Sequence, residues 1–205
     1  MKQWMKKLIT MTVCLVLLCS FGLVATAQEE PTEVTILFTH DLHSHLLPST
    51  RSDGSQFGGY ARLMTAIQEQ KTKYPDAILV DAGDFSMGSL FQTAFASSAI
   101  ELRIMGAMGY DTTTFGNHEF DYLPQGFASM LNAAVASGDP LPFIVDANYL
   151  PPLAGEEGYD EDAAAVWEAL DRYGVKEYQI LERDGVYYVL FGLTGVDSDA
   201  CAPNS

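Results

Sequence analysis

Residues 34–38, VTILF, form a β-rich apolar run that predicts a strand buried on both of its faces. Three later segments read in the same way, namely residues 77–80, 112–115 and 143–145. Segments with helical spacing of apolar residues separate these runs. Strands that alternate with helices indicate an α/β fold built on a parallel sheet. The fold class is therefore expected to be α/β.

Glycines and the spacing of apolar residues predict where the helical segments begin and end. We expect one helix to begin after Gly59, a second to run unbroken over residues 91–108 and end at Gly109, and a third to include residues 127–134. Each of these helices would join two consecutive strands of the sheet.

The last quarter of the chain reads differently. Residues 151–174 are interpreted as a surface excursion whose second half, residues 163–172, is helical. Residues 178–182 and 186–190 flank an Asp-Gly turn and predict a β-hairpin.

Polar side chains follow three of the predicted strands where each strand ends. Asp41 and His43 follow the first strand and Asp84 follows the second. Asn117 and His118 follow the third. Ligands of open α/β sheets bind at the carboxyl ends of the strands, so these side chains are expected to meet at one edge.

The residue types at this edge suit a divalent metal site. Carboxylate, imidazole and amide oxygen ligands favour Mn²⁺, Zn²⁺, Co²⁺ or Fe over a thiolate-bound metal. Asp84 is the natural bridge, because a carboxylate can hold two ions roughly 3.5–4 Å apart. Taken singly, each residue has an ordinary explanation as a helix cap, a turn former or a surface histidine. The prediction depends on their occurring together.

Three motifs carry a family resemblance. DLH at residues 41–43, GD at residues 83–84 and GNHEFD at residues 116–121 resemble the motifs of the metallophosphoesterase (calcineurin-like) superfamily. The longer segment TILFTHDLHSHLLP, residues 35–48, is similar to sequences of the branch that contains 5′-nucleotidases and 2′,3′-cyclic-nucleotide phosphodiesterases. The resemblance implies a layered α/β metallophosphoesterase-like sandwich with a dinuclear metal centre.

The resemblance also implies roles for single residues. Asp41 and His43 would bind the first metal ion, Asp84 would bridge the two ions, and Asn117 would bind the second. All four are thus expected to be metal ligands.

The remaining polar residues of GNHEFD would have other tasks. His118 would stabilise charge on the phosphate or on the leaving oxygen, and Asp121 would orient its imidazole. Glu119 is expected to be structural and to accept hydrogen bonds from loop amides.

The chain also departs from the family pattern. His40 stands where the family usually has asparagine, and Ser44 stands where glycine is common. The family completes its metal site with histidines further along, but no histidine follows His118 here. We therefore expect residues 28–205 to be the N-terminal part of the catalytic domain, without the C-terminal substrate-binding domain.

The N-terminus predicts export. Three lysines precede the apolar residues 8–24, and Ala25-Thr26-Ala27 follows, as in a signal peptide cleaved after residue 27. An uncleaved membrane anchor is the alternative. The formal net charge of −16 disfavours nucleic-acid polymers and anionic membranes as partners.

These observations favour an exported 5′-nucleotidase-type phosphohydrolase acting on a small nucleotide or another phosphate ester. One alternative is a non-catalytic secreted metal-binding fragment. Another is a related esterase, such as a cyclic-nucleotide phosphodiesterase, a UDP-sugar hydrolase or a sulfate-thiol esterase. A calcium site in the acidic residues 156–162 is disfavoured, because their spacing does not match a calcium-binding loop.

Overall fold

The structure is a computed structural model that describes residues 2–4 and 33–202, apart from the side chain of residue 199. The chain divides into two compact units, residues 1–33 and 34–205. The predicted signal peptide, residues 1–27, lies outside the described residues except for residues 2–4, which are helical. Within the described ranges, no helix is long and apolar enough to cross a membrane.

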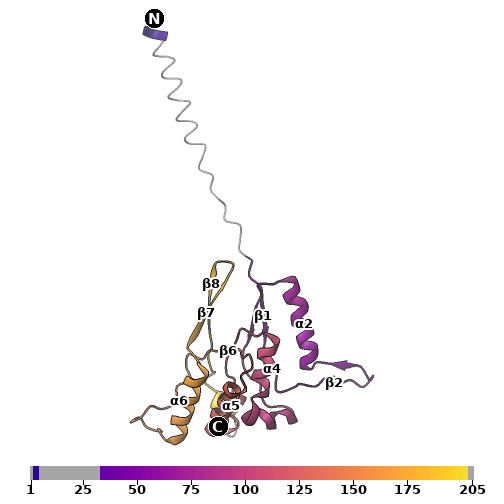
Figure 1. Ribbon diagram of the computed structural model, residues 1–205, viewed down its shortest axis with the longest axis vertical. Helices are drawn as coiled ribbons and strands as arrows, with labels where there is room; N and C mark the ends of the chain where they lie inside the picture. The colour runs from indigo at the N-terminus through magenta and orange to yellow at the C-terminus, as the bar shows by residue number, and fades with distance from the viewer. Residues whose placement is uncertain (1, 5–32, 203–205) are drawn as a thin grey trace. The chain divides into compact units, whose positions relative to one another are not determined.

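The second unit is built on a parallel sheet of four strands (Figure 1). The strands are β1 (Ile36–Thr39), β4 (Ile78–Asp81), β5 (Thr112–Thr113) and β6 (Phe143–Ile144), and they lie side by side in that order. All three pairings are parallel. The α/β fold class and the parallel sheet are thus confirmed.

Four longer helices accompany the sheet: α2 (Tyr60–Lys73), α4 (Ile100–Met108), α5 (Leu123–Ser137) and α6 (Glu161–Tyr173). The helices predicted after Gly59 and over residues 127–134 are α2 and α5. Helices α4 and α5 contribute large buried side chains to the core, among them Leu102, Met105, Phe127, Met130 and Leu131.

The single helix predicted over residues 91–108 is wrong, although its end at Gly109 is right. The segment forms a 3₁₀ helix, η1 (Leu90–Ala94), then α3 (Phe95–Ser98) and then α4. Between α3 and α4, Ala99 takes a left-handed conformation with φ of 47° and is fully buried. A left-handed residue cannot continue a right-handed helix, so the chain turns there.

The expectation that the first strand is buried on both faces is also wrong. Ile36 is 52% exposed and Phe38 is 68% exposed, whereas Leu37 packs against the core. Side chains two residues apart in a strand point to the same face, so Leu37 lies on the packed face of β1, and the face with Ile36 and Phe38 is uncovered among the described residues.

Residues 151–174 are only partly a surface excursion. The first half is an exposed loop, but α6 packs against α5 and buries Val166, Ala169 and Leu170 in the core. Helical periodicity was visible in the sequence, but the packing partner of the buried side was not.

Two hairpins complete the unit. The predicted one is confirmed as β7 (Tyr178–Arg183) and β8 (Val186–Phe191), with Asp184 and Gly185 at positive φ in the turn. A smaller hairpin, β2 (Ser49–Thr50) with β3 (Gln56–Phe57), was not predicted. Two short helices, η2 (His118–Phe120) and α7 (Ser198–Cys201), lie in the later loops.

Candidate metal centre

The loops that follow β1 and β4 stay joined beyond the end of the sheet. Three amides of the first loop donate hydrogen bonds to carbonyls of the second: Asp41 to Gly83 at 3.1 Å, His43 to Asp84 at 3.0 Å and Ser44 to Phe85 at 2.9 Å. The predicted ligands on the two loops are therefore held in a fixed register.

Both loops have unusual backbone conformations at the predicted ligands. Asp41, His43, Ser44 and Asp84 all have positive φ, between 47° and 55°. Non-glycine residues rarely adopt this region, and each such residue costs about 1–3 kcal/mol. Strain of this kind persists where the surrounding bonds enforce it, and it often marks a functional site.

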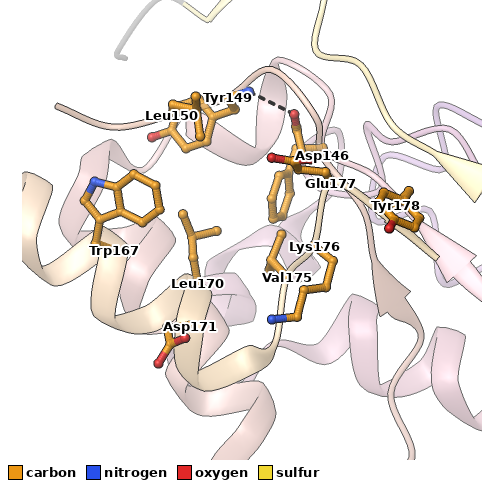
Figure 2. A pocket seen from close by; sticks show the side chains of 11 residues that line it. Asp146, Tyr149, Leu150, Trp167, Leu170, Asp171, Val175, Lys176, Glu177 and Tyr178 are labelled. Carbon is orange, nitrogen blue, oxygen red and sulfur yellow. Dashed lines mark hydrogen bonds between the residues drawn. The ribbon is translucent and has the colours of Figure 1, made fainter. Parts of the chain in front are cut away.

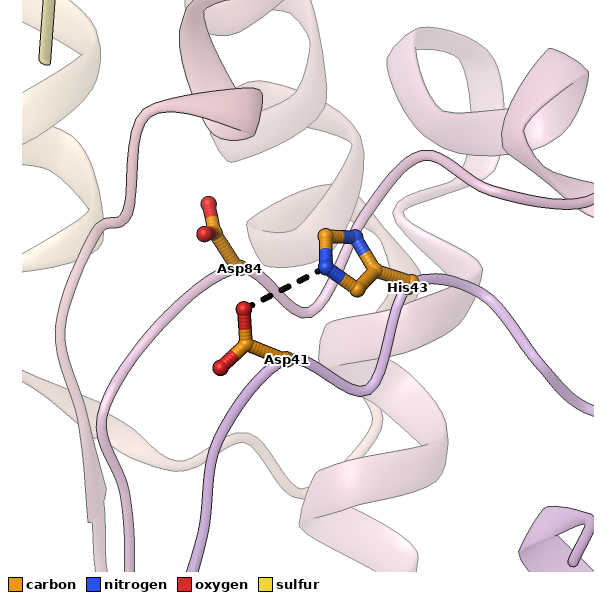
Figure 3. Close-up of side chains that lie close together, drawn as sticks. All are labelled: Asp41, His43 and Asp84. Carbon is orange, nitrogen blue, oxygen red and sulfur yellow. Dashed lines mark ion pairs between the residues drawn. The ribbon is translucent and has the colours of Figure 1, made fainter. Parts of the chain in front are cut away.

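The loops bring three of the predicted ligands together (Figure 3). Asp41, His43 and Asp84 each offer one ligand atom, and these atoms lie within 4.8 Å of one another. We call these three residues the metal-ligand group. The Nε2 atom of His43 lies 3.3 Å from a carboxylate oxygen of Asp41.

The protonation of His43 fits metal binding. Its Nδ1 atom lies 3.1 Å from the carbonyl oxygen of Ser86, which can only accept, so Nδ1 carries the proton. Nε2, on the other side of the ring, lies toward Asp41 and is the nitrogen that a metal ion would take. Metal-bound histidines usually have their second ring nitrogen held in this way.

The loop after β5 packs tightly against Asp84. The backbone amide of His118 donates to Asp84 Oδ1 at 3.0 Å. A Cβ atom on Gly116 would lie 2.2 Å from the same oxygen, so only glycine fits at this position. The carboxylate of Asp84 is thus fixed from the side of the third strand.

Glu119 connects the second and third loops, as expected of a structural residue. Its carboxylate is fully buried and accepts four hydrogen bonds. Oε2 accepts from the amides of Asp84 and Gly116, and Oε1 accepts from the amide and the hydroxyl of Ser86. Burial nevertheless raises the pKa of Glu119 to about 7.

His118 and Asp121 form the predicted pair. The Nδ1 atom of His118 lies 2.7 Å from the buried carboxylate of Asp121. Partial burial lowers the pKa of His118, but the hydrogen bond to Asp121 and the nearby carboxylate charges raise it more. The rings of His118 and His43 lie 5.2 Å apart, so this pair adjoins the metal-ligand group.

Asn117 lies between Gly116 and His118, which both contact Asp84. Its side-chain nitrogen donates to the carbonyl of Cys201 at 3.0 Å. In this orientation the side-chain nitrogen of Asn117 is bonded to Cys201, so the amide oxygen is the atom that could bind a metal ion.

Two further contacts of this site were not predicted from the sequence. His40 forms a short hydrogen bond to Asp41, which holds the pKa of Asp41 below its usual value. Its departure from the family pattern was the available signal. The second contact joins His43 to the carbonyl of Ser86. This carbonyl is a backbone group, so the residue type at position 86 does not predict the contact.

A cavity of about 600 Å³ lies elsewhere, between α6 and the chain leading into β7 (Figure 2). Tyr149, Trp167 and Leu170 give it apolar walls, and Asp171 and Lys176 bring exposed charges of opposite sign. None of the six predicted site residues lines it. The candidate site is therefore placed at the strand ends.

Comparison with known proteins gives a family match. The family model described as "Calcineurin-like phosphoesterase" matches residues 34–192. Human 5′-nucleotidase is 32% identical over 151 residues, which cover 66% of this chain and 26% of that protein. The trifunctional nucleotide phosphoesterase protein YfkN of Bacillus subtilis is 33% identical over 181 residues, which cover 81% of this chain and 11% of that protein.

Solved structures agree with this match. The NAD nucleotidase of Haemophilus influenzae superposes with a TM-score of 0.61 at 26% identity, covering 82% of this chain and 27% of that one. A 5′-nucleotidase precursor from Thermus thermophilus gives a TM-score of 0.60 at 25% identity, covering 80% and 29%. The chain spans less than a third of the length of each of these four proteins.

Proposed function

The chain belongs to the calcineurin-like phosphoesterase family, and from this premise we propose that it is a metal-dependent 5′-nucleotidase-type hydrolase of nucleotide phosphate esters. Relatives named 5′-nucleotidase at about 32% identity support the family's chemistry for this chain. The substrate class, the number of ions and the export of the protein are the parts that this proposal adds.

One observation carries the proposal. Asp41, His43 and Asp84 each bring one ligand atom to within 4.8 Å of the others, and the carbonyl of Ser86 can accept from Nδ1 of His43 so that Nε2 is left for an ion. Two carboxylates and a neutral imidazole are the donors that a Mn²⁺, Zn²⁺, Co²⁺ or Fe site uses.

Divalent ions in this group would acidify a water molecule and neutralise charge on the phosphate. The leaving oxygen of the ester needs a proton or a hydrogen bond as its bond to phosphorus breaks. His118 is placed for this task, because Asp121 accepts from Nδ1 and leaves Nε2 for the substrate. Glu119 and Gly116 keep Asp84 in place while this happens.

We propose that Asp41, His43 and Asp84 bind the first ion and that Asp84 and Asn117 bind the second. The second ion then has only two ligands from this chain, neither of them an imidazole. We expect the 205-residue chain to bind that ion weakly and to hydrolyse nucleotides slowly.

We also propose that residues 28–205 are the N-terminal part of a catalytic domain and that a substrate-binding domain lies outside this sequence. The lengths of the matched relatives support this division. The Thermus thermophilus relative is a 5′-nucleotidase precursor, and this similarity and the pattern of residues 1–27 support export.

The test combines metal binding with hydrolysis. The purified chain is titrated with Mn²⁺, followed by electron paramagnetic resonance, and is assayed for release of phosphate from AMP with Mn²⁺ or Co²⁺. We expect Asp84→Asn to weaken Mn²⁺ binding at least tenfold and to abolish any hydrolysis. Asp53→Asn, an exposed aspartate between β2 and β3, is the matched control and should change neither.

The outcomes separate the alternatives. Mn²⁺ binding that is unaffected by Asp84→Asn would remove the metal site and with it the proposed function. Tight binding with no hydrolysis of AMP, of cyclic nucleotides or of UDP-sugars would favour the non-catalytic metal-binding fragment.

A further inference from the structure

A buried carboxyl group is connected to the metal-ligand group through Ser44. Glu101, in the first turn of α4, is fully buried, and its Oε1 atom accepts a hydrogen bond from the hydroxyl of Ser44 at 2.7 Å. Ser44 is also fully buried and follows His43 in the chain. The contact joins a core helix to the loop that carries Asp41 and His43.

This arrangement costs stability. Glu101 Oε2 is buried and has no hydrogen-bond partner among the described residues. Burial also raises the pKa of the Glu101 carboxyl. An apolar side chain of similar size would avoid both penalties. A costly polar group is retained in a core helix here, and its hydrogen bond to Ser44 indicates its role.

Ser44 is the last residue of the strained turn. With φ of 49°, it takes a conformation that a residue with a Cβ atom disfavours. Three of its groups are tied: the amide donates to Phe85, the carbonyl accepts from Ser89 Oγ at 2.6 Å, and the hydroxyl donates to Glu101. Only the last of these bonds reaches into a helix of the core.

The helix that carries Glu101 is a firm support. Its neighbours Leu102 and Met105 belong to the fully buried core. The left-handed Ala99 starts α4 as a separate helix and so places Glu101 in its first turn. A bond to this helix can therefore hold the loop against the core.

We propose that Glu101 is a positioning residue that, through Ser44, fixes the turn of residues 41–44 and thereby sets Asp41 and His43 for metal binding. This inference rests on the proposed metal site. Glu101 touches neither the metal-ligand group nor a substrate, so its effect must appear as a change in metal affinity.

The test compares variants that keep or remove the acceptor oxygen. Glu101→Met removes it at similar volume, Ser44→Ala removes the donor, and Glu101→Gln keeps an acceptor in the same shape. We expect the first two to weaken Mn²⁺ binding about tenfold, as for partners that orient metal ligands, and Glu101→Gln to stay within about threefold of the parent chain. The double variant should be no weaker than either single one, because both changes break the same bond.

A thermal melt separates positioning from simple packing. The double variant, which removes both the donor and the acceptor, should melt at the parent temperature or above it while binding Mn²⁺ less tightly, a split that a purely structural role would not give. Glu69→Met, at an exposed position of α2, is the matched control for the same change of residue type away from the loop. It should leave Mn²⁺ affinity unchanged.

Parent-level Mn²⁺ affinity in Ser44→Ala, or in a folded Glu101→Met, would overturn the inference while leaving the metal site intact. Failure of the parent chain itself to bind Mn²⁺ would overturn both.

Discussion

Replacing Glu119 by glutamine should destabilise the folded chain strongly. Each carboxylate oxygen of Glu119 accepts from two donors: Oε2 from the amides of Asp84 and Gly116, and Oε1 from Ser86 twice. The side-chain nitrogen of a glutamine must replace one of these oxygens. In place of Oε2, that nitrogen would face the amides of Asp84 and Gly116, whereas in place of Oε1 it would face only the Ser86 amide, because the Ser86 hydroxyl can turn and accept.

The size of the effect follows from this count. The cheaper orientation loses one hydrogen bond to a charged group, so we expect a loss of about 1.5–3 kcal/mol in the free energy of unfolding. For a chain of this size, that loss lowers the melting temperature by about 3–12 °C.

The assay is calorimetry at pH 8, where the carboxyl group is ionised in the folded chain because its pKa lies at about 7. Glu69→Gln, an exposed glutamate on α2, controls for the loss of one negative charge. Equal melting temperatures for Glu119→Gln and the control would refute the reasoning, because four bonds to a buried group cannot be exchanged without cost.

Three further predictions concern the site and the N-terminus. In a preparation that hydrolyses AMP, His118→Ala should lower kcat by about 10²–10⁴-fold with little loss of bound metal. Asp84→Ala should instead remove the bound metal. Equal metal loss in the two variants would mean that His118 is a metal ligand. Gly116→Ala should weaken Mn²⁺ binding, because its Cβ atom would displace the Asp84 carboxylate. The control Gly54→Ala should leave Mn²⁺ binding unchanged, because its Cβ atom would meet nothing within 4 Å. Expression with an intact export system should yield a protein that begins at Gln28, as found by mass spectrometry of its N-terminal peptide. A start at Met1 would contradict the signal peptide.

Much of the fold could be predicted from local patterns. Leu63, Met64 and Ile67 recur at helical spacing, and the residues between 178 and 190 alternate around an Asp-Gly turn, so α2 and the β7–β8 hairpin were found. These signals depend only on neighbours in the chain.

Errors arose where tertiary contacts decide. Nothing in the sequence around Ala99 marks a left-handed residue, because alanine is a good helix former and the break comes from packing in the core. Phe38 is apolar but exposed, because its face of β1 is uncovered among the described residues. Local composition cannot tell which face of a strand is covered.

The candidate site was predictable in its residues but not in its bonds. The order of Asp41, Asp84 and Asn117 after three strands indicated a shared edge. The carbonyl of Ser86 and the carboxyl of Glu101 escaped notice, since one is a backbone group and the other lies on a helix distant in sequence. Such supports become visible only when distant segments are brought together.

The backbone bonds between the loops after β1 and β4 bear on how the protein meets its metal. The amides of Asp41, His43 and Ser44 are paired as firmly as those of a strand. In hydrogen–deuterium exchange, they should be protected before any ion is added, in contrast to amides of the exposed loop at residues 154–159. Little of the chain has to become ordered when an ion enters such a site, so the rate of binding should be limited by the loss of the ion's own water shell. The same rigidity should make the site selective for ions whose radius suits it.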